Sequence, residues 1–309
     1  MPAAEDGNGP GPDMGHGLFV QAGKLTHSCR PNCSWYTTSD GKGKVIRAIQ
    51  PISKGEELTV DYLGGELFPL PQRRKDLLDS KGFLCHCTRC EESAQGGDDT
   101  RRFQCFSTSK MNDDSKEGIP TASSSCGGVH FLIQPLASSK PELTACTGCH
   151  QVAPQEYVDH CCDMEIALSE ELKELDLIME RNNNVIYDGQ EEEKQQEQKE
   201  KEIIDVSHRI EQLEPPHRLH CLASKIYAMK GNQYLQQGEY QRAADAFTKQ
   251  VECRTAILGT TNKNDTTAWC VERVGDALRH VNLDEATDAY KETIRTLKVS
   301  CVLFCFVIV

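Results

Sequence analysis

Hydrophobic and polar positions divide the chain into a strand-like first part and a helical second part. Residues 44–52 and 58–62 are rich in β-branched residues that alternate with polar ones, a pattern typical of strands. From residue 163 to residue 213, apolar residues recur at spacings of three and four, which indicates amphipathic helices. Residues 71–83 predict a short helix that ends at a C-cap glycine, Gly82.

Three biased stretches separate the predicted elements. Residues 1–14 are rich in Pro and Gly and have little to bury, so they predict a disordered lead-in. Residues 93–125 carry clusters of Gly, Asp and Ser and predict a loop insertion. Residues 188–202 are almost uniformly charged or polar, which is typical of a solvated helix or linker rather than of a binding site.

The carboxy-terminal part contains an internal repeat with a period of about 43 residues. Glycine, alanine and aromatic positions of a first unit, 231–247, recur in a second unit, 275–290. Small residues at helix crossings with an aromatic residue nearby are typical of tetratricopeptide-like helix pairs. We therefore expect Phe247 and Tyr290 to be buried equivalents. Because two units cannot bury a core alone, both should dock on a helix at 217–230 and on the first half of the chain.

An apolar run, residues 299–309, ends the chain. It is well short of the roughly 20 residues that a helix needs to span a bilayer. A translated intron or frame error, a buried strand and a membrane tail therefore stay open as explanations. Whatever its origin, such a segment is prone to aggregate when it is exposed.

Composition narrows the class of partner and of cysteine chemistry. The 309 residues leave room for two or three domains, and the net charge is −13. This negative charge argues against binding to the phosphate backbone of a nucleic acid. It favours basic partners such as lysine-rich protein tails. The chain has 16 cysteines and no apolar secretory segment at its start. The cysteines thus indicate thiolates in a reducing compartment, and hence metal binding.

Three cysteines, Cys85, Cys87 and Cys90, lie too close together in sequence for all of them to pair with one another as disulfides. As thiolates they can converge on one zinc ion, and Cys29 is the natural fourth ligand. A free-standing zinc knuckle and a disulfide scaffold are the alternatives on the cysteine pattern alone.

Three ordered motifs carry a family resemblance: LTHSCRPNCSW at 25–35, RAIQPISKGEELTVDY at 47–62 and GFLCHCTRCEE at 82–92. They resemble the Asn-His-Ser-Cys-x-Pro-Asn signature, the closing strand with the catalytic tyrosine, and the post-SET zinc segment of SET-domain protein-lysine methyltransferases, in particular of the SET-and-MYND branch. The resemblance is strong over residues 15–92 and weaker beyond. It implies an α+β fold: an incomplete SET β-fold with a post-SET zinc segment, followed by an all-α tetratricopeptide-like domain.

The resemblance also implies an active site that uses S-adenosylmethionine. Tyr62 would be the catalytic tyrosine, whose hydroxyl lies beside the sulfonium methyl and the lysine amine. His27 would contact the cofactor, and Phe83 would cover its adenine by stacking. Thr26 stands where the family usually has an asparagine that binds the cofactor's amino-acid part, so we expect weaker cofactor affinity.

A second set of cysteines follows, and relatives of this branch carry a four-cysteine zinc ribbon at this place. Here the usual first Cys-x-x-Cys pair is split by about twenty residues. The alternative is a set of ordinary buried cysteines. His150 is a substitute ligand in this scheme, and Cys161 and Cys162 are bystanders. The residues of this second zinc site would be Cys105, Cys126, Cys146 and Cys149.

The resemblance leaves part of the family's domain without a counterpart. GHGLF at 15–19 leads directly into the His-Ser-Cys motif, so it is not the family's cofactor-binding Gly-x-Gly loop. We therefore expect a carboxy-terminal fragment that lacks the MYND module and the first half of the SET domain, whether a truncated gene model, a shortened isoform or a decayed homologue. Asn32 and Arg47 also match the signature, as structural residues.

Two functions follow from the motifs. The first is a protein-lysine methyltransferase that uses S-adenosylmethionine and zinc on a histone or another protein, with little activity as a fragment. The second is a non-catalytic interaction module built from zinc and helical repeats. Neither binds nucleic acid or membrane directly, the helical domain would bind other proteins, and the compartment would be cytoplasm, nucleus or both.

These interpretations give the following expected division of the chain: a lead-in at 1–14, half of a SET domain at 15–84, a zinc segment with a second ribbon at 85–162, a helical segment with a charged linker at 163–213, tetratricopeptide-like helices at 214–298 and an apolar tail at 299–309.

Overall fold

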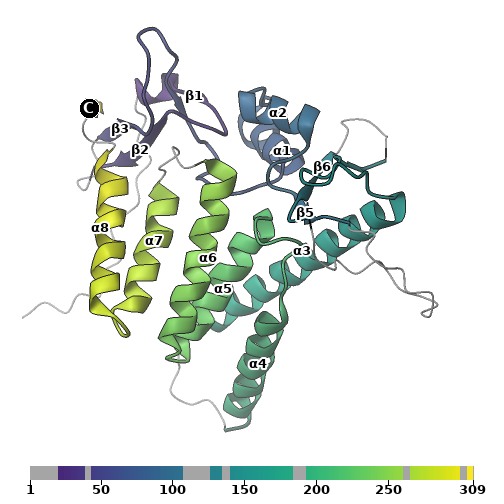
Figure 1. Ribbon diagram of the computed structural model, residues 1–309. Coiled ribbons are helices and arrows are strands. Elements are labelled where there is room, and N and C mark those ends of the chain that lie inside the picture. The colour runs from purple at the N-terminus through teal and green to yellow at the C-terminus, as the bar shows by residue number, and fades with distance from the viewer. Residues whose placement is uncertain are drawn as a thin grey trace, which may run out of the picture.

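Strands dominate the first part of the described chain and helices the second, so the fold is an α+β arrangement (Figure 1). The structure is a computed structural model, and it describes residues 20–38, 43–106, 126–133, 140–183, 193–259, 265–299 and 305–308. The helices α5 to α8 stand side by side as one layer, and the first strands lie at one end of that layer.

Two small sheets form the first part. A short 3-10 turn at Ala22–Lys24 precedes β1 (Thr26–His27), which pairs in parallel with β4 (Thr59–Val60). The strands β2 (Cys33–Thr37) and β3 (Lys44–Ala48) form an antiparallel pair. Their shared core contains Cys33, Ile46 and Val60, so the predicted β-branched strands do provide the buried side chains.

Part of the apolar carboxy-terminal run forms a strand. Residues 305–308 make β8 (Cys305–Ile308), which pairs antiparallel with β3 from Lys44↔Ile308 to Arg47↔Cys305. These four residues thus form a strand, while residues 300–304 and 309 lie outside the described chain. No helix among the described residues combines the length and the apolar character needed to cross a membrane.

The predicted short helix is confirmed as α1 (Leu70–Lys81). It ends at Gly82, which adopts a left-handed conformation (φ 77°) and donates its N–H to the carbonyl of Leu78. Glycine adopts that conformation without the steric cost of a Cβ, so the C-cap prediction is confirmed. A second helix, α2 (Thr88–Gly96), starts inside the Cys-rich segment.

The prediction of a loop insertion over 93–125 is wrong at its start. Residues 93–96 continue α2, and β5 (Arg102–Gln104) joins β6 (Val129–Ile133) and β7 (Glu142–Leu143) in an antiparallel sheet. The strand forms because Phe103 buries its ring completely in a core with Leu132 and Leu143, a long-range contact that local polarity hides. Residues 107–125 lie outside the described chain.

Two long helices connect this sheet to the rest. The first, α3 (Gln155–Asn183), begins eight residues before the predicted helical start at 163, because Tyr157, Val158 and Cys161 pack against the sheet. The charged stretch contributes to α4 (Glu193–Gln212), while residues 184–192 lie outside the described chain. The apolar face of both helices packs on α5, as Leu172, Val206 and Ile226 illustrate.

The carboxy-terminal helices repeat one packing arrangement. They are α5 (Cys221–Gln236), α6 (Tyr240–Leu258), α7 (Asp265–Leu278) and α8 (Leu283–Val299). A Cβ on Gly231 would lie 2.3 Å from the ring of Phe247, and a Cβ on Gly275 would lie 2.8 Å from the ring of Tyr290. Each glycine therefore admits the aromatic ring of the next helix, as the repeat predicts.

The expected equivalence of the two aromatic residues holds for their contacts but not for their burial. Phe247 is 0% exposed, whereas Tyr290 is only partly buried. The difference arises because α6 lies between two helices, whereas α8 has a helical neighbour on one side only among the described residues. The Tyr290 hydroxyl instead donates to Asp276 at 2.8 Å.

The helices also dock on the first half of the chain, as expected. Leu67 packs among buried residues of α5 and α6, including Ala223 and Ile257. Arg254 donates to the carbonyl of Gly65 at 2.6 Å, across 189 residues of sequence. This contact fixes the segment that follows Tyr62 against the helical layer.

Candidate active site and metal centres

The parallel pair β1–β4 brings the two sequence motifs of the candidate active site together. Thr26 lies opposite Thr59 and His27 opposite Val60. The N–H of Tyr62 donates to Nδ1 of His27 at 3.0 Å, and the two rings are 5.2 Å apart. The Tyr62 hydroxyl donates to the carbonyl of Leu25. Residues far apart in sequence thus form one site.

Asn32 holds the second motif in place. Its side-chain amide donates to the carbonyl of Glu57 at 2.8 Å and to Glu56 at 3.1 Å, and its oxygen accepts the N–H of Thr59 at 2.8 Å. The side chain is 4% exposed, so these bonds satisfy a buried amide. Its structural role agrees with the sequence interpretation.

A cleft opens beside Tyr62. It has a volume of about 360 Å³ and is lined by Ala22, Gly23, Leu25, Trp35, Lys44, Ile46, Val60, Tyr62 and Lys81. Tyr62 itself is 38% exposed. Its ring and that of Phe83 are nearly perpendicular, with their centroids 6.5 Å apart. Phe83 also packs against the neighbouring cysteines, so its ring lies between Tyr62 and the first cluster. Thr26 is exposed.

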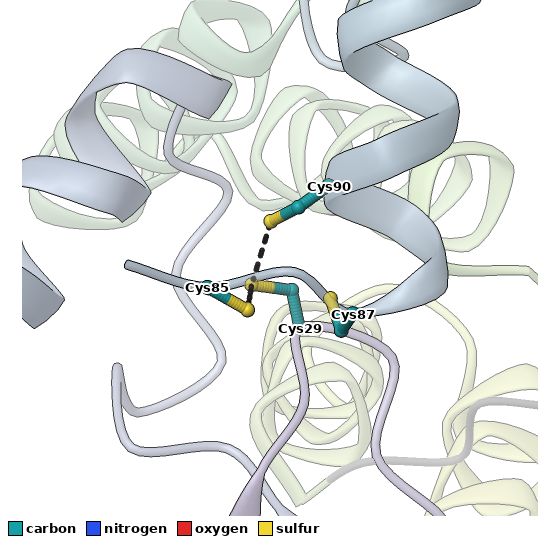
Figure 2. Close-up of side chains that lie close together, drawn as sticks. All are labelled: Cys29, Cys85, Cys87 and Cys90. Carbon is teal, nitrogen blue, oxygen red and sulfur yellow. Dashed lines mark hydrogen bonds between the residues drawn. The ribbon is translucent and has the colours of Figure 1, made fainter. Parts of the chain in front are cut away.

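Four cysteines converge immediately beside this site, and we call Cys29, Cys85, Cys87 and Cys90 the first cluster (Figure 2). Their sulfurs all lie within 4.8 Å of one another; the Cys29 sulfur is 3.6 Å from that of Cys90 and 4.0 Å from that of Cys85. A hydrogen bond from Cys29 lowers the pKa of Cys85 far below its usual value and lowers that of Cys87 to about 5, whereas hydrogen bonds to these neighbours raise the pKa of Cys29 and of Cys90. Thiolates in this arrangement have the donor chemistry of a tetrahedral zinc site.

His27 connects the first cluster to Tyr62. Its Nδ1 accepts from the Tyr62 N–H, so the proton of the neutral ring is on Nε2, which lies 3.2 Å from the Cys29 sulfur and donates to it. The side chain is fully buried. The imidazole therefore faces the thiols, and a cofactor contact from this residue would come from its backbone.

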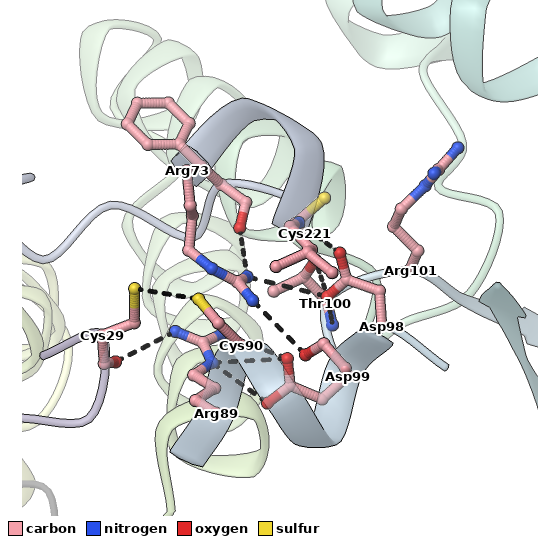
Figure 3. Close-up of polar contacts among 12 residues, drawn as sticks. Cys29, Arg73, Arg89, Cys90, Asp98, Asp99, Thr100, Arg101 and Cys221 are labelled. Atoms are coloured by element: carbon pink, nitrogen blue, oxygen red, sulfur yellow. Dashed lines mark hydrogen bonds and ion pairs between the residues drawn. The ribbon is translucent and has the colours of Figure 1, made fainter. Parts of the chain in front are cut away.

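Buried arginines tie the first cluster to the rest of the fold (Figure 3). Arg89 donates to the carbonyl of Cys29 at 3.3 Å and pairs with Asp99 at 3.2 Å. Arg73 lies 3.6 Å from Asp98, whose carboxylate also accepts from Thr100. The carbonyl of Thr100 in turn accepts the N–H of Cys221 at 2.7 Å, at the start of α5. Sequence reasoning missed this network, because arginines within a polar helix give no signal of burial.

Four further cysteines form a second cluster: Cys105, Cys126, Cys146 and Cys149. The Cys105 and Cys149 sulfurs are 3.5 Å apart, and those of Cys126 and Cys146 are 3.4 Å apart. Burial opposes ionisation of Cys146, but the N–H groups of Cys149 and Gly148 outweigh it and lower the pKa of Cys146 to about 6. The structure thus unites the split pair. His150 is exposed and lies outside the group of converging ligand atoms.

A third buried group, Glu165, His220 and Cys221, does not fit a metal. Arg101 already holds both carboxylate oxygens of Glu165, at 2.9 and 3.0 Å. Nδ1 of His220 accepts the N–H of Leu222 at 3.2 Å, so its proton is on Nε2, 3.4 Å from Glu165. Burial raises the pKa of Cys221 well above its usual value, so the thiol stays protonated. This group is an internal ion pair with a capping histidine.

The two motifs that meet at His27 and Tyr62 lie in a part of the chain that is similar to known proteins. Residues 6–63 match the family model described as SET domain. Similar proteins include "Histone-lysine N-methyltransferase SMYD3" of Mus musculus, 40% identical over 86 residues, which make up 28% of this chain and 19% of the relative. "SET domain-containing protein SmydA-8, isoform A" of Drosophila melanogaster is 37% identical over 84 residues, 26% of this chain and 17% of the relative.

A third similar protein is "Potential protein lysine methyltransferase SET6" of Saccharomyces cerevisiae, 35% identical over 82 residues, 26% of this chain and 21% of the relative. The predicted resemblance to SET-and-MYND methyltransferases is confirmed for the first part of the chain. The match covers about a fifth of the length of these relatives.

Proposed function

We propose that the chain contributes the carboxy-terminal half of the active site of a protein-lysine N-methyltransferase that uses S-adenosylmethionine. The observation that carries this proposal is the contact of the two motifs, in which the Tyr62 N–H binds His27 and His27 binds the Cys29 sulfur. Because the ring and the main chain around Tyr62 are fixed from two sides, its hydroxyl has a defined position at the cleft.

The residues at the cleft suit methylation of a lysine. A free lysine has a pKa near 10.4, so its amine has to lose its proton and its water before it can react. The Tyr62 hydroxyl would orient the neutral amine, and the apolar walls formed by Leu25 and Val60 would exclude water. S-adenosylmethionine supplies the methyl group when bound; Thr26, the His27 backbone and Phe83 are the residues that would hold it.

Zinc has a structural role in this proposal. The first cluster corresponds to a post-SET zinc segment, and closed four-thiolate sites of this kind stabilise a fold rather than react. The second cluster would hold another zinc ion in a ribbon, and α5 to α8 would serve as a tetratricopeptide-like domain. We propose a lysine-bearing protein, histone or otherwise, as the substrate, further proteins as partners of the helical domain, and the cytoplasm, the nucleus or both as the compartment.

The test uses the 309-residue chain and a chimera in which its SET segment replaces the matched segment of the similar SMYD3 protein. Cofactor titration should show feeble binding by the chain alone and clear binding by the chimera. In the chimera, Tyr62→Phe should lower turnover on a lysine substrate at least tenfold with little change in cofactor affinity, since the hydroxyl acts mainly in the transition state. Tyr36→Phe, at an exposed strand tyrosine, is the matched control.

Thr26→Asn in the same chimera should tighten cofactor binding, because an amide offers more hydrogen bonds than a hydroxyl. A chimera that folds, holds zinc and binds no cofactor would contradict the proposal and would favour a non-catalytic interaction module. Equal turnover by the chimera and its Tyr62→Phe variant would contradict the role of the tyrosine.

A further inference from the structure

We propose that the second cysteine cluster is a site of reversible thiol oxidation, at which a hydroperoxide joins Cys105 to Cys149 and Cys126 to Cys146 and thereby releases the bound metal. The inference rests on the proposed function only in so far as the second cluster holds zinc. Methyl transfer plays no part in it.

Solvent access distinguishes the two clusters. In the second cluster Cys149 is exposed and Cys126 is partly exposed. In the first cluster Cys29, Cys85 and Cys90 are buried and only Cys87 is partly exposed. A thiolate attacks a peroxide along the axis of the peroxide O–O bond, so the peroxide needs open access to the sulfur. The exposure of each cysteine therefore decides which thiolate is oxidised first. Cys149 is therefore the point of entry.

Cys105 and Cys146 are buried, and among the described residues two glycines lie directly against the sulfurs of the second cluster. A Cβ on Gly128 would lie 2.5 Å from the Cys146 sulfur, and a Cβ on Gly148 would lie 3.2 Å from the Cys126 sulfur. The N–H of Gly128 donates to the Cys126 sulfur at 3.3 Å, and the N–H of Gly148 donates to the Cys146 sulfur at 3.4 Å. By contrast, Leu77, Phe83 and Ala94 pack over the first cluster.

The positions of the sulfurs select the pairs that would form. Cys105 follows β5, and its sulfur is 3.5 Å from that of Cys149, which lies in the turn beyond β7. Cys126 precedes β6, and its sulfur is 3.4 Å from that of Cys146. Both pairs link different chain segments. The sequence motif Cys-x-x-Cys would instead suggest a bridge between Cys146 and Cys149.

The chemistry balances with hydrogen peroxide as the oxidant. The Cys149 thiolate attacks one peroxide oxygen, the O–O bond breaks, and the products are a sulfenic acid and hydroxide, which takes up a proton to become water. The Cys105 thiolate then attacks the Cys149 sulfur and expels a second hydroxide, which becomes a second water. A second peroxide joins Cys126 and Cys146 in the same way. Each peroxide gains two electrons and each pair of sulfurs loses two, and zinc leaves as the free ion when its thiolate ligands are consumed.

The experiment titrates the zinc-loaded 309-residue chain with hydrogen peroxide and follows zinc with a chromogenic indicator. Free thiols are then alkylated and the disulfides are mapped by mass spectrometry without reduction. We expect about one of two zinc ions per chain to be released, together with the bridges Cys105–Cys149 and Cys126–Cys146, while the first-cluster thiols stay free. Dithiothreitol followed by zinc should restore the initial content.

Two variants sharpen the result. Cys149→Ser should purify with about one zinc less and should release no zinc over the same range of peroxide. Cys162→Ser removes a partly buried cysteine of α3 outside the cluster and should behave as the parent chain. Four outcomes would each overturn the inference. Peroxide could release both zinc ions together, oxidise the first cluster before the second, or produce a Cys146–Cys149 bridge. The chain could also purify with only the first-cluster zinc. If the chimera transferred no methyl group, the proposed function would be contradicted. The zinc release and the disulfide map of the 309-residue chain would not be affected by that result.

Discussion

The two cysteine clusters have the same four-thiol composition but different surroundings. Side chains of α1, α2 and the segment before β2 enclose the first cluster, and His27 joins it to Tyr62. The second cluster lies at one end of a three-stranded sheet, with Gly128 and Gly148 against its sulfurs and with Cys149 exposed. The comparison teaches that the role of such a cluster depends on its cover and its contacts. The first cluster contacts the candidate active site, whereas the second joins only the ends of the sheet β5–β6–β7.

The largest effect should come from a substitution in the first cluster. Cys87→Ser should remove about one zinc per chain and unfold the SET segment, because structural zinc contributes roughly 10–16 kcal/mol to small zinc domains. Cys149→Ser, the matched change in the second cluster, should also remove one zinc but leave the thermal unfolding of the SET segment unchanged. Zinc content and melting curves of both variants provide the check. Full zinc content in Cys87→Ser would contradict the first-cluster assignment.

The helical layer provides the next test. Phe247→Ala should lower the free energy of unfolding by about 3–5 kcal/mol, as for other large-to-small changes in a core. Tyr290→Ala should cost clearly less, since its ring is only partly buried. Urea denaturation of both variants measures the difference. If the free energy of unfolding of Phe247→Ala lies within about 0.5 kcal/mol of the parent value, the repeat does not form a core.

The ion pair of Arg101 and Glu165 joins the residue before β5 to α3, beside the start of α5. Burial would raise the pKa of Glu165, but His220 and Arg101 outweigh it and hold the pKa below its usual value of 4.5. A depressed native pKa adds stability above the unfolded value, and this stability is lost as the pH falls through the native one. Glu165→Gln should therefore cost about 2–3 kcal/mol at pH 7. The difference in free energy of unfolding between variant and parent should shrink below pH 4.5. A difference that is constant with pH would rule out the carboxylate charge as its cause.

The smallest effect should come from the surface near the first cluster. Arg30 and Glu92 form an exposed pair at 3.1 Å, with both side chains in contact with solvent. Exposed pairs of this kind contribute about 0.2–1 kcal/mol, so Glu92→Ala should shift the melting temperature by little. A large shift would mean that the cover of the first cluster extends to the surface.

The sequence predicted most of the residues that meet at the site, because the motifs specify both chemistry and order. Cys29 and Tyr62 lie near Cys85 and Phe83 as the motifs suggest, and the glycine–aromatic repeat predicted the crossings at Phe247 and Tyr290. These features depend on local pattern, which a sequence displays directly.

Other features depend on contacts between distant segments and could not be predicted. The burial of Phe103 turns a polar stretch into a strand, and β8 pairs with β3 across most of the chain. The different exposure of Cys90 and Cys149 likewise follows from what packs over each cluster, and equal spacing motifs carry no information about it.

The central claim, that the first cluster holds the candidate active site in place, is tested most directly by hydrogen exchange at the Tyr62 amide. In the folded chain this amide donates to His27, and His27 donates to the Cys29 sulfur. Exchange over residues 59–63 should rise at least tenfold in Cys87→Ser and should stay at the parent level in Cys149→Ser. The same rise in both variants, or in neither, would contradict the claim.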